Sequence, residues 1–179
     1  IVPCEEIAAT GHSYTNGVCE ICGDINDGFA LVDDIWGWYE DGLLAESATG
    51  LVEGSINGSD TKWYYIKNGV FTKSTGISRK ADGTDNKWYF VKNGVFTKAT
   101  GISKKADGTD KKWYFVKNGV FTKSTGIAKK AYGTDKKWYF VRKGVFTRDS
   151  LITKKADGSS SVQYLVTGGK FRSDYSGTY

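Results

Sequence analysis

Short aromatic-rich apolar segments alternate with polar turn segments along most of this chain. The stretch KWYFVKNGVF occupies residues 87–96 and recurs unchanged at 112–121, with near copies at 62–71 and 137–146. Aromatic and β-branched residues favour strands, and Asn-Gly between two apolar runs is a strong signal of a tight hairpin turn. The pattern therefore predicts antiparallel β-hairpins, with no helix signal in this part of the chain.

The hairpin segments recur at a fixed spacing of 25 residues. An earlier, divergent copy opens at Trp38, and the last copy has Gln163 where the others have tryptophan. Divergent end copies are typical of the capping units of a stacked array. The sequence thus predicts an all-β fold over residues 25–179, an elongated array of stacked β-hairpin repeats (a β-solenoid) of about six units. The units start near residues 38, 63, 88, 113, 138 and 163.

Each predicted hairpin is apolar on both faces. Alternation along the strand puts Trp88 and Phe90 on one face, with Tyr89 and Val91 on the other. Because a lone hairpin is marginally stable in water, neighbouring copies must cover both faces. A second turn, ADGTD, joins each GISKK-like strand to the next WYF strand; its two aspartates are more typical of a turn than of a calcium loop.

Charge divides the chain into an acidic head and a basic body. Residues 1–62 carry 12 acidic side chains and one lysine, a balance of −11, whereas residues 63–162 reach +15. A basic body can bind polyanions, and the alternative is that its lysines keep an aromatic-rich array soluble. No apolar run approaches the ~20 residues of a membrane-spanning helix, so no transmembrane segment is predicted.

The repeated unit resembles a known family. The element WYY or WYF (as in Trp88-Tyr89-Phe90), a turn glycine, and a short strand closing in Thr-Gly (as in Thr100-Gly101) stand in the order found in the cell-wall-binding, or choline-binding, repeats of Gram-positive surface proteins. Those repeats are similar to the carbohydrate-binding repeats of clostridial toxins. The resemblance covers roughly residues 28–179. It implies a β-hairpin solenoid that is secreted and bound to, or exposed on, a bacterial cell surface or cell wall.

The resemblance also places the candidate ligand-binding residues on the aromatic pairs of the repeats. These are Trp63, Tyr64, Trp88, Tyr89, Trp113, Tyr114, Trp138 and Tyr139. The tryptophan of the family's Gly-Trp strand is replaced by isoleucine or leucine in every copy, as at Ile102, which removes an aromatic wall from a cation cage. Choline is therefore disfavoured, and a sugar or an anionic wall polymer fits better. The alternative role for these aromatic side chains is packing between hairpins.

The amino-terminal segment, residues 1–24, holds every cysteine and the only histidine. Cys4, His12, Cys19 and Cys22 fall within 19 residues, and a Cys-x-x-Cys-Gly knuckle closes the segment. This order predicts one structural, tetrahedral Cys₃His zinc site. The alternatives are a Cys19–Cys22 or Cys4–Cys19 disulfide, or reduced thiols without a ligand.

The residue inventory argues against an enzyme. The single histidine is assigned to the cysteine cluster, which leaves no Ser-His-Asp or Cys-His set, and no phosphate-binding or dinucleotide motif is present. We therefore expect a non-catalytic cell-wall or glycan-binding module of an extracellular bacterial protein. A passive stalk on the cell surface is the alternative. Polyanion or nucleic-acid binding is weaker, because the lysines follow the repeat and do not converge on one groove, so no specific nucleic-acid partner is predicted.

Overall fold

The computed structural model describes residues 13–58, 60–133 and 135–172. Within these ranges the chain forms short strands and turns and contains no helix, so none that could cross a membrane. The all-β class predicted from the sequence is confirmed. The strands are β1 (Tyr14–Thr15), β2 (Val18–Cys19), β3 (Gly28–Val32), β4 (Ile35–Glu40), β5 (Leu43–Leu44), β6 (Gly50–Gly54), β7 (Lys62–Lys67), β8 (Val70–Phe71), β9 (Gly76–Ser78), β10 (Tyr89–Lys92), β11 (Val95–Phe96), β12 (Gly101–Ser103), β13 (Tyr114–Lys117), β14 (Val120–Phe121), β15 (Gly126–Ala128), β16 (Tyr139–Arg142), β17 (Val145–Phe146), β18 (Leu151–Thr153), β19 (Tyr164–Thr167) and β20 (Lys170–Phe171).

A three-stranded antiparallel unit recurs along the chain. Strand β10 pairs with β9 before it and with β11 after it, and the same pairing joins β12–β14 and β15–β17. The turn between β10 and β11 is Asn93-Gly94, whose φ angles are 51° and 79°. Two positive φ angles are what a two-residue type I′ hairpin turn requires. The Asn-Gly signal in the sequence therefore predicted the turn correctly.

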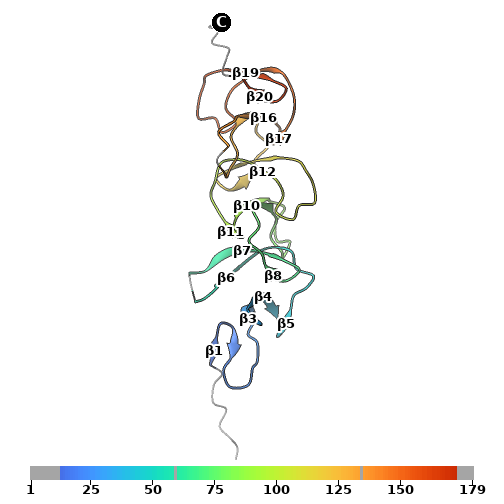
Figure 1. The fold of residues 1–179 in the computed structure, drawn as a ribbon, viewed down its shortest axis with the longest axis vertical. Helices are drawn as coiled ribbons and strands as arrows, with labels where there is room; N and C mark the ends of the chain where they lie inside the picture. Colours follow the sequence, from blue (N-terminus) through green and yellow to red (C-terminus); the bar gives the residue numbers. More distant parts are fainter. Residues whose placement is uncertain (1–12, 59, 134, 173–179) are drawn as a thin grey trace, which may run out of the picture.

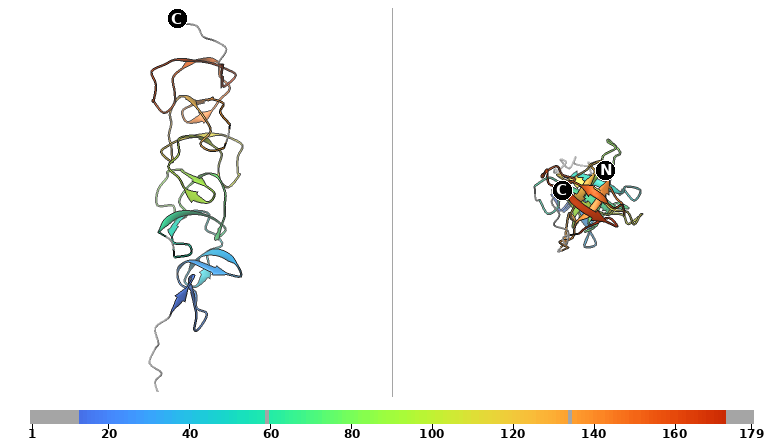
Figure 2. Two further views of the ribbon diagram at one scale, coloured as in Figure 1. Left: turned by 60° about the vertical axis from the view of Figure 1, so that its left-hand side comes forward. Right: turned by 90° about the horizontal axis from the view of Figure 1, so that it is seen from above.

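Successive units are stacked along the long axis of the molecule, which is narrow when seen end-on (Figures 1 and 2). Strand β10 pairs with β14 of the following unit, and the N–H of Phe90 donates to the carbonyl of Gly119 at 2.7 Å. A parallel bridge joins Ile77 to Lys105, and equivalent bridges recur in the following units. Strands β3 and β20 lie near opposite ends of the structure in Figure 1. Each unit is thus hydrogen-bonded to its neighbours in the array, as in repeat proteins generally.

The core is a column of equivalent side chains. Phe90 and Val91 are both fully buried although they are neighbours on opposite faces of β10, so both faces are covered, as the alternation predicted. The isoleucine that follows the closing Thr-Gly is covered by the next unit. Ile102 is 1% exposed beneath the next unit, whereas Ile152, in the last described unit, is 51% exposed. Burial of this position therefore depends on the unit that follows.

The amino-terminal part of the described chain differs from the repeats. Strands β1 and β2 form a separate two-stranded hairpin, and β3 and β4 pair over five residues, from Gly28 opposite Tyr39 to Val32 opposite Ile35. Phe29 of β3 packs edge-on against Trp38 and Tyr64, with ring centroids 5.2 and 5.3 Å apart. This hairpin therefore covers the aromatic side chains of the first repeats.

Candidate functional site

The aromatic residues predicted to bind ligand lie at the border between core and surface. Trp63, Trp88 and their equivalents in later units are half-buried, as is Tyr89. Tyr64 is different because Phe29 packs against it, and only 6% of its surface is exposed. The tryptophans and the later tyrosines are therefore accessible in part, while Tyr64 belongs to the core.

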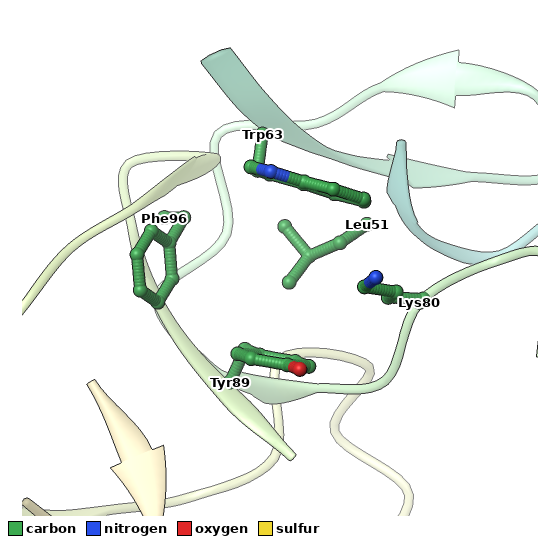
Figure 3. Close-up of a pocket in the computed structure, with 5 residues that line it drawn as sticks. All are labelled: Leu51, Trp63, Lys80, Tyr89 and Phe96. Carbon is green, nitrogen blue, oxygen red and sulfur yellow. The ribbon is translucent and has the colours of Figure 1, made fainter. Parts of the chain in front are cut away.

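A small cavity of about 180 Å³ joins two consecutive units at these aromatic side chains. It is lined by Leu51, Trp63, Lys80, Tyr89 and Phe96 (Figure 3). The rings of Trp63 and Tyr89 lie on opposite sides of the space, Lys80 enters from one edge, and Phe96 closes the other. The Trp of one unit and the Tyr of the next thus form a shared site.

A lysine ammonium lies over the indole ring in each of these sites. The Nζ of Lys80 is 4.5 Å from the ring centroid of Trp63, and that of Lys105 is 4.9 Å from Trp88. Lys130 and Lys155 repeat the contact on Trp113 and Trp138. An ammonium at this distance is attracted by the negative face of the ring. The repeats therefore carry their own cation at the position where an aromatic site would bind one.

A second cation lies over three of the four tryptophans. It belongs to Arg79 over Trp88, to Lys104 over Trp113 and to Lys129 over Trp138, at 4.9, 5.3 and 5.0 Å. Because these rings already contact two basic side chains, their faces are poorly suited to stack on a sugar or on a choline group. What they present to solvent is a basic, partly apolar edge.

An aspartate and a tyrosine complete three of the four sites. Asp85 lies 3.8 Å from Lys80 and accepts a 2.6 Å hydrogen bond from the hydroxyl of Tyr89. The backbone N–H of Lys87 also donates to this carboxylate, at 2.9 Å. The bonds from Tyr89 and Lys87 lower the pKa of Asp85, and the same carboxylate together with burial raises the pKa of Tyr89 to about 12. The Trp–Lys–Asp–Tyr set recurs as Trp88, Lys105, Asp110 and Tyr114, and as Trp113, Lys130, Asp135 and Tyr139.

Asp82, the other aspartate of the ADGTD turn, has a local role. Its carboxylate accepts hydrogen bonds from both the N–H and the hydroxyl of Thr84, each at 2.9 Å. This is the hydrogen bonding of an Asx turn. The turn interpretation of ADGTD is thus correct for Asp82, but it missed that the second aspartate belongs to the aromatic site. The signal available was its constant position four residues before the tyrosine.

Replacing Asp85 by asparagine is expected to lower the pKa of Tyr89 from about 12 toward 10, because the carboxylate that holds its proton is lost. A phenol whose pKa is raised on folding stabilises the protein fully below pH 10, and this contribution is lost as the pH rises from 10 to about 12. In Asp85→Asn this contribution is absent, so the variant should be less stable than the parent chain below pH 10, and its stability should fall less between pH 10 and about 12. Tyrosinate absorbance, compared with that of Tyr89→Phe, isolates the titration of this residue. Asp82→Asn is the matched control, and an equal shift in both variants would contradict the assignment.

A basic pocket of about 390 Å³ lies near the carboxyl-terminal end of the described chain. Among the described residues, its lining combines two aromatic rings with four basic side chains and includes no carboxylate. The lining residues are Lys136, Lys137, Trp138, Lys170, Phe171 and Arg172. Such a pocket suits an anionic group such as a phosphate or a carboxylate.

The predicted zinc site lies largely outside the described residues. Cys4 and His12 are not among them; Cys19 is buried in β2 and Cys22 is exposed in the following turn. The described ranges contain no group of three His, Cys, Asp or Glu side chains able to hold a metal ion. Zinc binding by Cys4, His12, Cys19 and Cys22 therefore stays a prediction.

Comparison of the chain with protein-family models, with curated proteins and with solved structures finds no match.

Proposed function

We propose that residues 25–179 form a β-hairpin solenoid of six units and act as a non-catalytic module that binds an anionic cell-wall polymer. The resemblance of the repeat to cell-wall-binding repeats of Gram-positive bacteria supports the location, an extracellular wall or cell surface. The basic pocket around Trp138 supports the chemistry, because it offers the ammonium groups of Lys136, Lys137 and Lys170 to phosphate or carboxylate groups. A linear polymer and a linear array can also make the same contact several times, which raises the overall affinity.

The aromatic sites of the repeats argue against a cationic ligand such as choline for those repeats. In each, the repeat's own lysine already contacts the indole ring, and that lysine is paired with an aspartate in three of them. A neutral glycan would have to stack on rings such as Trp113, whose contacts include Lys104 and Lys130. An anionic polymer instead meets the exposed lysines that lie along the array.

The double variant Lys137→Gln, Lys170→Gln is expected to bind wall polymer about tenfold more weakly than the parent chain, since exposed charge contacts contribute up to about 1 kcal/mol each. The measurement is retention on purified cell walls, and on an isolated phosphate-rich wall polymer, by titration at constant ionic strength. The variant Lys67→Gln, Lys73→Gln removes the same charge outside the pocket and should lose less than about twofold.

Other outcomes of this experiment would favour the alternatives. If the chain binds no wall fraction and no glycan, it is a passive stalk. If duplex DNA competes as well as wall polymer at equal phosphate concentration, charge alone determines binding. Equal losses in the two double variants would exclude the pocket as the binding site.

A further inference from the structure

A second pocket, of about 490 Å³, lies between the first two units, and its chemistry is opposite to that of the basic pocket. Two indole rings, Trp38 and Trp63, share its lining with the carboxylates of Glu40, Glu53 and Asp82. The Nε1–H of Trp38 donates to Glu40 at 2.9 Å, which fixes the position of that ring. Among the described residues, no lysine or arginine lines this pocket.

The strand register shows that Glu53 replaces a cation of the repeat. In the first unit Glu53 is the direct partner of Trp63 across β6 and β7. In the next unit Ser78 pairs with Tyr89, so the following residue, Arg79, comes opposite Trp88 and lies 4.9 Å from its ring. Glu53 thus occupies the place of Arg79 and of the lysines that follow it in later repeats.

The other cation of the repeat is missing from the same pocket. The residue after Arg79 is Lys80, whose ammonium lies over Trp63; the residue after Glu53 is Gly54. A Cβ atom placed on Gly54 would lie 3.1 Å from Cζ3 of Trp38, so this position faces Trp38 as Lys80 faces Trp63. Both internal cations are therefore absent here, one exchanged for a carboxylate and the other for a glycine.

We propose that this pocket binds the cationic side chain of a lysine or arginine supplied by another polypeptide. The ring of Trp38 attracts a cation, and Trp63, which Lys80 contacts, lacks the second cation that lies over the later tryptophans. The three carboxylates accept the N–H donors of the bound cation, and every later repeat holds a basic side chain at the equivalent place. The balance of −11 over residues 1–62 attracts cations to this end of the molecule. This site is separate from the wall-polymer site of the proposed function, and an anionic polymer would be repelled from it.

The test uses N-acetyl-L-arginine amide as probe and its citrulline analogue, which has nearly the same shape without the charge. The arginine probe is expected to perturb the Trp38 and Trp63 indole N–H signals saturably in NMR titrations, with a dissociation constant in the millimolar range and at least tenfold tighter than citrulline. Tetramethylammonium, which carries charge but no N–H donor, should bind more weakly than the arginine probe.

Glu53→Lys restores the pattern of the other repeats and is expected to abolish binding of the probe, since the pocket then carries its own cation. Glu53→Gln should weaken binding at least fivefold, while Asp34→Asn, which removes one exposed charge outside the pocket, should change it less than twofold. Glu53 is exposed, so these variants should fold, and circular dichroism checks this.

Sedimentation of the intact chain identifies which polypeptide supplies the cationic side chain. Self-association that increases with concentration and disappears in Glu53→Lys would identify a second copy as the donor; a monomer that binds the probe points to a different polypeptide. Equal binding of arginine and citrulline probes, or unchanged binding in Glu53→Lys, would overturn the proposal. Retention on cell walls should not fall in Glu53→Lys, so failure here is distinguishable from failure of the wall-binding function.

Discussion

Replacing Phe115 by alanine is expected to destabilise the array by about 3–5 kcal/mol, the usual cost of emptying a fully buried phenylalanine site. Phe115 is completely buried, and it packs in one cluster with Ile102, Ala128, Val141 and Ala156. These neighbours come from its own unit and from units on either side of it in the chain. A cavity here therefore weakens the packing between repeats as well as the hairpin that contains Phe115.

Urea unfolding followed by circular dichroism measures this loss as a shift of the midpoint. Because stability in a repeat array is nearly a sum of unit and interface contributions, a weakened central interface should also broaden the transition or split it in two. Val162→Ala is the control: Val162 is 58% exposed, and its truncation should change stability by less than about 0.5 kcal/mol. A similar loss in both variants would show that the column of buried aromatic side chains does not hold the units together.

Much of the fold could be predicted from the sequence because its signals are local. Asn93-Gly94 specifies a type I′ turn by its own backbone preferences, and the strands on both sides follow from β-branched and aromatic residues. The fixed spacing of Phe90 and Phe115 then implies that each unit repeats the environment of the last. Local preference and periodicity together were sufficient to predict stacked hairpins.

The aromatic sites could not be predicted in the same way. Lys80 follows Trp63 by 17 residues, and its contact with the ring depends on how the ADGTD turn folds back over the previous unit. In the sequence such a lysine is indistinguishable from one that only keeps the surface soluble. Tyr64 and Tyr89 occupy the same place in their repeats, yet only Tyr64 is covered by Phe29. The solvent accessibility of Tyr64 therefore depends on the amino-terminal hairpin that contains Phe29, which lies outside the repeat pattern.

The pocket lined by Trp38, Trp63 and three carboxylates shows a further limit of a prediction based on the repeat period alone. Trp38 and Trp63 keep the 25-residue spacing, but Leu51 of the first unit corresponds to Ile77 of the next, because Leu51 pairs with Tyr65 and Ile77 with Phe90. This shift of one residue is what aligns Glu53 with Arg79. The Thr-Gly motif also shows this shift in the sequence, but only the pairing of the strands shows that Glu53 lies opposite Trp63, where later repeats place a cation.

Gly101→Ala is expected to destabilise the chain by about 3 kcal/mol or more, because it acts on the backbone contact between two units. Gly101 has a φ of 151°, a backbone conformation that residues with side chains rarely adopt. A Cβ atom at this position would lie 2.6 Å from the N of Ala131 and 2.6 Å from the O of Lys129, both in the following unit. The neighbouring residue Ile102 bonds to these same two residues, at 2.8 and 3.0 Å. The methyl group would therefore displace the segment that these hydrogen bonds hold in place.

Gly108→Ala provides the matched control within the same unit. Gly108 also has a positive φ, 72°, but an added Cβ would meet no atom within 4 Å. Its substitution should cost only the conformational strain, roughly 1–2 kcal/mol. The difference between the two urea midpoints measures the effect of close packing between units, and faster hydrogen exchange at the amides of Ile102 and Ala131 in Gly101→Ala alone would locate that effect at the interface. Equal destabilisation by both substitutions would mean that the glycine of the Thr-Gly motif is needed for its backbone conformation and not for the approach of the next repeat.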